Sequence, residues 1–175
     1  AFADDNMSVF AEFNIGESFS VGVEYHPGSI STPSNTNVQQ NGSTGGATVN
    51  NDGNRTSGGT AATNTVQADF DDLTTIYLMF VSEIGLYSRL GYSHVDVTTK
   101  ESLGTGGSYG NVTTDGATLA LGYQHVGDTG MFARVEVSAS AWDSVSATNT
   151  SEATKKVEIS DMASASASLK IGKTF

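Results

Sequence analysis

Hydrophobic and polar residues alternate with a period of two along much of this chain. The clearest example is the C-terminal segment, where the apolar positions are Ala163, Ala165, Ala167, Leu169 and Ile171. Serine, lysine and glycine fill the positions between them, and the chain ends on the aromatic residue Phe175. Such alternation is typical of a β-strand with one apolar face and one polar face.

Six further segments alternate in the same way, and together with the C-terminal segment they predict an all-β fold with seven strands. These segments cover residues 7–15, 19–25, 73–81, 86–97, 117–126 and 131–142. Nothing between them is typical of a crossover helix, which excludes a βαβ fold. No apolar run approaches the roughly 18 residues that a transmembrane helix needs.

Short turns and long polar connections alternate along the chain. Glycine-containing turns occur at residues 16–17, 82–85 and 127–130, whereas longer polar stretches cover about 27–65, 98–115 and 143–156. This order predicts an antiparallel up-and-down β-barrel, with tight turns at one rim and long loops at the other. We interpret residues 1–175 as one domain. The stretch at 27–65, rich in Asn, Gly, Ser and Thr, is expected to be a low-complexity loop.

The odd number of strands conflicts with this architecture. Bacterial single-chain barrels have even strand numbers and carry both termini on the short-turn side. Here the first connection is short, which places the N-terminus on the long-loop side. We therefore expect an eighth strand upstream of Ala1. A break at residues 161–162 and an extra strand in the long loop are the alternatives. Whether Ala1 is a mature N-terminus or a truncation stays open.

The polar faces of the strands carry balanced charges, although the chain has 19 acidic and only 8 basic residues. In a membrane barrel the polar face points into the lumen, whereas in a soluble barrel it points to solvent. Buried charges must be paired, so we predict an ion-pair network that fills a narrow lumen. Its members are Glu12, Glu24, Arg89, Arg134, Glu136 and Lys170. The alternative is the solvated outer face of a soluble ligand-binding barrel or sandwich.

Small and aromatic residues are sorted between the two faces. The polar face carries glycines that leave room for long charged side chains: Gly22, Gly91, Gly122 and Gly172. Most aromatics belong to the apolar face and lie near strand ends, as in an interfacial girdle: Phe13, Phe19, Tyr25, Phe80, Tyr92, Tyr123 and Phe175. Phe10, Tyr77 and Trp142 belong to the polar face.

Composition argues against several classes of function. The net charge of −11 disfavours nucleic acid as a partner. The chain lacks cysteine, and its histidines are not spaced as metal ligands. The acidic run at 69–72 lacks the pattern of a calcium loop. We expect no metal and no cofactor. Ser93, His94 and His125 are the only candidates for hydrolase chemistry, and without a G-x-S-x-G motif we predict that the protein is not an enzyme.

The final nine residues, Ala-Ser-Leu-Lys-Ile-Gly-Lys-Thr-Phe, resemble the C-terminal signature of outer-membrane β-barrel proteins. The whole chain resembles the small OmpA/OmpX-like barrel superfamily, on segments such as Asp-Leu-Thr-Thr-Ile-Tyr and Leu-Gly-Tyr-Ser-His-Val-Asp-Val. The resemblance assigns Leu169, Ile171 and Phe175 to the signal read by the barrel-assembly machinery. Lys173 departs from that signature, which usually has an apolar residue there.

This resemblance implies a location in the bacterial outer membrane, in contact with lipid and lipopolysaccharide. The expected role is non-enzymatic: a small barrel with a side-chain-filled lumen, which supports the membrane or displays surface loops. A narrow pore for small solutes or ions is the first alternative. A surface adhesin or docking protein is the second, with an extracellular partner that the sequence does not identify.

Overall fold

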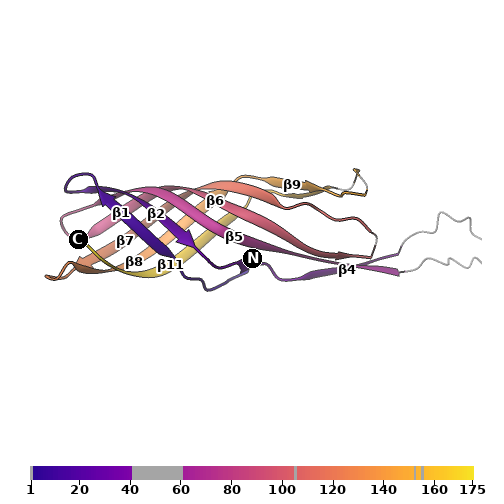
Figure 1. Ribbon diagram of the computed structural model, residues 1–175, viewed down its shortest axis with the longest axis horizontal. Helices are drawn as coiled ribbons and strands as arrows, with labels where there is room; N and C mark the ends of the chain where they lie inside the picture. Colours follow the sequence, from indigo (N-terminus) through magenta and orange to yellow (C-terminus); the bar gives the residue numbers. More distant parts are fainter. Residues whose placement is uncertain (1, 41–60, 105, 152, 155) are drawn as a thin grey trace, which may run out of the picture.

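The computed structural model describes residues 2–40, 61–104, 106–151, 153–154 and 156–175. Across these residues the regular structure is entirely β (Figure 1). The strands are β1 (Val9–Asn14), β2 (Phe19–His26), β3 (Ile30–Ser31), β4 (Asn35–Gln40), β5 (Ala61–Val81), β6 (Leu86–Leu103), β7 (Val112–Val126), β8 (Met131–Trp142), β9 (Val145–Thr148), β10 (Lys156–Ile159) and β11 (Ala163–Lys173).

Seven strands form the main sheet, in the order β1-β2-β5-β6-β7-β8-β11. Every neighbouring pair is antiparallel. This confirms the seven predicted strands and their up-and-down order. The tight turns close with glycines that have positive φ, namely Gly16, Gly85 and Gly130, a backbone conformation that glycine adopts without steric cost.

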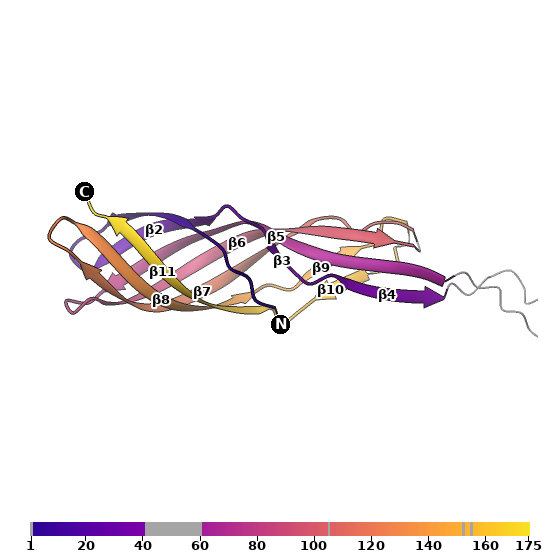
Figure 2. The ribbon, with the colours of Figure 1, turned by 90° about the horizontal axis from the view of Figure 1, so that it is seen from below.

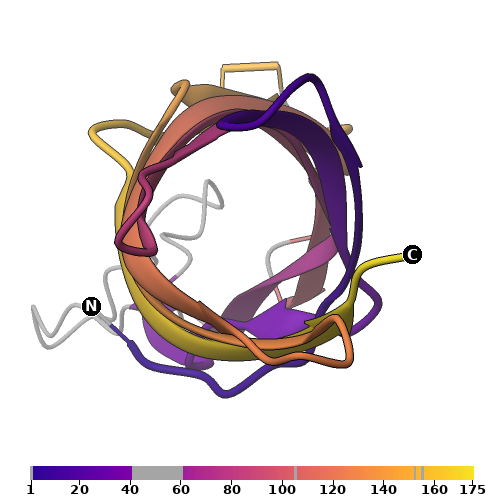
Figure 3. The same ribbon diagram turned by 90° about the vertical axis from the view of Figure 1, so that its left-hand side faces the viewer.

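The sheet curls strongly about the long axis of the molecule (Figure 3). Its two ends are β1 and β11. Within the described residues, no Cα atom of β1 lies within 8 Å of a Cα atom of β11. We call the gap between these two strands the seam. The structure is thus a curled antiparallel sheet, an incomplete barrel in which the two edge strands are not hydrogen-bonded to each other.

Two central strands run far beyond the curled part of the sheet (Figures 1 and 2). β5 begins at Ala61 and not at residue 73, and β6 continues to Leu103. β4 pairs with residues 61–66 of β5. The stretch at 27–65 therefore contains β3, β4 and the start of β5, whereas its residues 41–60 lie outside the described part. Backbone hydrogen bonds between strands form equally well with Thr, Asn and Gln side chains, so low hydrophobicity did not prevent strand formation.

The final segment of the chain is divided, contrary to the unbroken alternation of its sequence. β10 pairs with β9 in a separate hairpin, and only β11 joins the main sheet. Asp161, between them, has a φ of 54°. The predicted polar connection at 143–156 thus contains β9 and the first residue of β10. The break at 161–162 is real, but it adds a hairpin beside the sheet and leaves the number of main-sheet strands at seven.

A β-bulge separates the curled part of β5 from its projecting part. Asp71 pairs with Asp96 and Thr74 with His94, so two residues of β5 lie opposite one residue of β6. Asp72, in the bulge, has a φ of 54°. We call β4, residues 61–72 of β5 and residues 96–103 of β6 the extension.

The two faces of the curled sheet differ as the sequence predicted. Apolar side chains on the outer face are exposed, including Leu90, Leu119, Val137 and Leu169, the last of which is 70% exposed. The charged side chains of the other face are buried, with Arg89 only 5% exposed. The apolar face therefore points outward and the polar face inward, which is the reverse of a soluble ligand-binding barrel.

Candidate functional site: a buried charge network

Six charged side chains from five strands meet inside the curled sheet. They are the residues that the sequence singled out: Glu12 on β1, Glu24 on β2, Arg89 on β6, Arg134 and Glu136 on β8, and Lys170 on β11. Glu12 is partly buried and the other five are buried. Alternation places each one inward, because the residues on both sides of it in its strand are more exposed than it is. We call this set the charge network.

Four members form the centre of the network. Arg89 donates from Nη1 to Glu24 Oε2 and from Nη2 to Glu136 Oε1, each at 2.8 Å. Lys170 Nζ lies 2.7 Å from Glu24 Oε2 and 3.2 Å from Glu136 Oε1. Two cations and two carboxylates thus alternate in a closed arrangement. Such pairing offsets the cost of removing these charges from water, which is several kcal/mol per isolated ion.

Arg134 and Glu12 form a second unit beside this centre. Arg134 Nη1 lies 2.5 Å from Glu12 Oε1, and Nη2 lies 2.7 Å from Oε2. This is the two-pronged geometry in which guanidinium and carboxylate planes match. Arg134 Nε also donates to Gln124 Oε1 at 2.6 Å. The guanidinium is therefore held on three sides.

Aromatic side chains complete the network, and the sequence analysis did not assign them to it. Tyr77 donates its hydroxyl to Glu12 at 2.7 Å, and Tyr87 donates to Glu136 at 3.0 Å. The Arg89 guanidinium lies 4.2 Å from the centre of the Tyr77 ring, and that of Arg134 lies 4.4 Å from the Phe132 ring. The alternation of the sequence does place Tyr77, Tyr87 and Phe132 at inward positions. It contains no information on which ring contacts which charged side chain.

Two ion pairs of the network cross the seam. Glu12 on β1 pairs with Arg134 on β8, and Glu24 on β2 pairs with Lys170 on β11. The first two strands of the sheet are therefore tied to the last two by side chains, although β1 and β11 share no backbone pairing. Phe10 on β1 adds a ring contact to Phe132, with centroids 6.1 Å apart.

A layer of hydroxyl groups lies on the inner face next to the network. Thr75 and Ser93 hydroxyls are 2.8 Å apart, Ser93 and Thr118 2.9 Å, and Thr118 and Ser140 2.8 Å. This chain of hydrogen bonds crosses β5, β6, β7 and β8. The sequence analysis did not predict it, because single Ser and Thr residues on a strand face carry no signal for mutual contact.

The hydrolase candidates are not brought together as a catalytic pair. Ser93 is buried on the inner face and bonded to the two threonines, whereas His94 is exposed and its Nδ1 lies 2.6 Å from Asp115. His125, on β7, is exposed. The residues assigned to the assembly signal, Leu169, Ile171 and Phe175, are all exposed.

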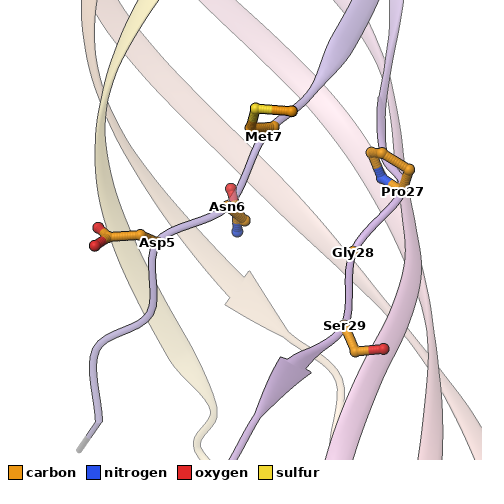
Figure 4. A pocket seen from close by; sticks show the side chains of 6 residues that line it. All are labelled: Asp5, Asn6, Met7, Pro27, Gly28 and Ser29. Carbon is orange, nitrogen blue, oxygen red and sulfur yellow. The ribbon is translucent and has the colours of Figure 1, made fainter.

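A shallow, open pocket lies outside the sheet interior, between the N-terminal segment and the turn after β2 (Figure 4). Its lining consists of Asp5, Asn6, Met7, Pro27, Gly28 and Ser29. Figure 4 shows the carboxylate of Asp5 pointing away from Pro27 and Ser29. The lining therefore brings no set of chemically reactive groups together.

Two structural features are absent from the described residues. They contain no group of three or more His, Cys, Asp or Glu residues placed to hold a metal ion. They also contain no helix that is long and apolar enough to cross a membrane.

Comparison with known proteins adds no identification. No family model, curated protein or solved structure matches this chain.

Proposed function

We propose that this protein is a membrane-spanning β-barrel of the bacterial outer membrane, with a non-enzymatic role. The observation that carries this proposal is the outer face of the curled sheet, where large apolar side chains are exposed on every main-sheet strand. Examples in strand order are Val9, Val21, Ile76, Leu90, Leu119, Val135 and Ile171. Soluble monomers rarely expose continuous apolar surfaces larger than a few hundred Å², whereas a lipid bilayer solvates such a surface.

Aromatic residues at the ends of this apolar surface support the same proposal. Phe13, Phe19 and Phe80 lie near the short-turn end, and the rings of Phe19 and Phe80 are 5.2 Å apart. Tyr92, further along β6, is also exposed. Aromatic rings are favoured at the two interfaces between hydrocarbon and water.

The charge network gives the proposed barrel a filled interior. Its three carboxylates and three cations are paired, so the lumen at this level is occupied by side chains. The role that fits is structural support and surface display, with the extension projecting beyond the membrane. Lipid, lipopolysaccharide and the barrel-assembly machinery are the proposed partners. Closure by an eighth strand stays a prediction.

Folding into lipid vesicles tests the proposal. The chain, diluted from urea into vesicles of short-chain phosphatidylcholine, is expected to gain β-structure by circular dichroism and to migrate differently on gels with and without heating. Protease should cleave the extension and spare the curled part of the main sheet. A chain that stays soluble and protease-sensitive beside the vesicles would contradict the proposal.

A narrow pore is the alternative function, and the inner face next to the seam favours it. Ser164 and Ser166 are exposed there although they belong to the inward series of β11. Conductance across planar bilayers separates the two functions, because a filled barrel should give no current or brief events only. Arg89→Met should raise the conductance if the network is the plug. Unchanged conductance in this variant would contradict the plug.

A further inference from the structure

The two edges of the main sheet lie unpaired on either side of the seam. Neither β1 nor β11 has a second pairing strand among the described residues. We propose that the seam accepts one extended polypeptide strand, antiparallel to both edges, with apolar residues facing outward and small residues facing inward. This inference rests on the proposed membrane location, because the outward residues of that strand would meet lipid.

The direction of the edge strands supports a single inserted strand. Six successive antiparallel pairings lead from β1 to β11, so these two strands run in the same direction. One strand between them can be antiparallel to both, which is the arrangement of every other neighbour in the sheet. Direct pairing of β1 with β11 would instead introduce one parallel ladder.

The separation of the two edge strands excludes their direct pairing. Neighbouring strands are about 4.8 Å apart, so one inserted strand separates its two flanking strands by about 10 Å. All Cα atoms of β1 lie more than 8 Å from those of β11. Yet Glu12 reaches Arg134, and Lys170 reaches Glu24, from opposite sides of the seam. The edges are too far apart to pair directly, and close enough for inner side chains to meet.

The surroundings of the seam define the chemistry of the occupant. Phe10 extends inward from β1, and the centre of its ring lies 5.9 Å from Lys170 Nζ. Because this ring and the crossing ion pairs occupy the interior beside the seam, we expect small residues, Gly, Ala or Ser, on the inner face of an inserted strand. On the outer face, the flanking residues Val9, Phe13, Leu169 and Ile171 are exposed and apolar. An inserted strand continues this apolar surface only with apolar residues of its own.

A second copy of the chain is a poorer occupant. Two copies inserted in the same orientation would pair β1 of one with β11 of the other in parallel. Two β11 edges can pair in antiparallel fashion only if the copies enter the membrane in opposite orientations. A single strand meets neither difficulty.

Disulfide cross-linking tests the proposal, because the chain has no cysteine of its own. The probe is an 11-residue peptide that alternates leucine with serine or glycine and carries one central cysteine at an outward position. It is added to the full chain folded in detergent micelles, in air-saturated buffer, so that dissolved oxygen takes up the two electrons released with each disulfide. The variants are Ala11→Cys on β1 and Ala165→Cys on β11, both outward and exposed. The control is Ala139→Cys on β8, also exposed, but flanked by β7 and β11 through Leu119 and Ala165.

Both edge variants are expected to cross-link to the peptide at least tenfold faster than the control. The same peptide with two of its residues replaced by proline should lose this advantage, because proline removes backbone donors. Cross-linking at one edge only, equal rates at Ala139→Cys, or edge-to-edge dimers of the chain would each overturn the proposal. Folding in micelles is followed separately by circular dichroism. Failure to enter vesicles without peptide therefore contradicts the membrane location, whereas failure to cross-link in micelles contradicts the strand site.

Discussion

At the scale of single residues, the inner face is built from large rings placed directly over glycines of the neighbouring strand. A Cβ atom added to Gly22 would lie 2.4 Å from the Tyr77 ring, and one on Gly122 would lie 2.4 Å from Tyr87. A Cβ atom added to Gly172 would likewise lie 2.3 Å from the Phe132 ring. These glycines are needed for space, because the rings that cover them also contact the charged side chains.

Gly122→Ala is expected to destabilise the folded protein by about 1–3 kcal/mol, the usual cost of overpacking. The added methyl would displace Tyr87, whose hydroxyl bonds to Glu136. The measurement is urea unfolding in micelles, followed by fluorescence of Trp142. Gly28→Ala is the matched control, because nothing lies within 4 Å of the position of its Cβ. Equal stability of the two variants would show that the ring has room to move.

Arg134→Met is expected to lower the free energy of unfolding by about 3–5 kcal/mol, because it leaves the partly buried Glu12 carboxylate without its cation. Adding Glu12→Gln should restore a large part of this loss, since the neutral amide needs no counter-charge. Urea unfolding of the two single variants and the double variant gives the coupling energy. A double variant whose loss equals the sum of the two single losses would rule out the pair as a coupled unit.

At the scale of elements, the bulge in β5 marks the change from curled sheet to extension. Asp72 adopts the left-handed conformation there, and its carboxylate accepts a hydrogen bond from the Tyr25 hydroxyl. Asp and Asn tolerate this conformation, whereas β-branched residues do not. The residue type thus fits the backbone position as well as the hydrogen bond.

Asp72→Val is expected to destabilise β5 by about 1–2 kcal/mol, the cost of a left-handed residue with a bulky side chain. Asp72→Asn should be close to the original protein, because it keeps both the backbone preference and an acceptor for Tyr25. Hydrogen exchange of the β5 amides near the bulge measures the difference. Equal protection in the two variants would contradict a backbone cause.

The extension contains an ion pair that should make it sensitive to pH. Lys100 and Ser31 donate hydrogen bonds to Asp69 and hold the pKa of that carboxyl below its ordinary value of 3.8. The bond to Asp69 raises the pKa of Lys100 above 10.5. The contribution of ionised Asp69 to the stability of the extension is therefore present above about pH 4, and it is lost as pH falls through the lowered pKa. The contribution of protonated Lys100 to this stability is present below about pH 10, and it is lost as pH rises through the raised pKa.

Lys100→Met should return the Asp69 pKa toward 3.8 and weaken the acid-dependent loss of structure in the extension. Carboxyl chemical shifts of Asp69 across pH 2–6 measure the change. Lys156→Met is the control, because Lys156 lies in the separate β9–β10 hairpin and pairs with Glu158 at 3.9 Å. An unchanged Asp69 titration in Lys100→Met would show that the Lys100 contact does not set its pKa.

At the scale of the whole molecule, the outer apolar surface defines the proposed relation to the membrane. Leu119, flanked by Leu90 and Ala139, lies within that surface. Leu119→Arg is expected to lower the free energy of unfolding in vesicles by about 2–4 kcal/mol, which is the effect of a cationic side chain near the middle of a bilayer. Val157→Arg is the matched control, because Val157 is exposed on β10, outside the main sheet. Similar losses in both variants would contradict a lipid-facing Leu119.

The sequence was most informative where one face is uniformly apolar. Alternation placed residues such as Arg89 and Leu90 on their correct faces, because successive side chains of a strand must point to opposite sides. It was less informative at strand ends. β5 starts 12 residues before its predicted start, at Ala61 rather than residue 73. Residues 61–72 contain only two large apolar side chains, Val66 and Phe70, and are held by backbone pairing.

The amino-acid sequence by itself determined the seven main-sheet strands, their antiparallel order and the inward position of six balanced charges, since these depend on local periodicity and turn residues. Only the tertiary structure decided which charge pairs with which, because Glu12 and Arg134 are 122 residues apart and meet only when the sheet curls. It also decided that β10 leaves the main sheet and that β1 and β11 remain apart. Pairing between distant strands depends on the curvature of the whole sheet, and no local pattern encodes that curvature.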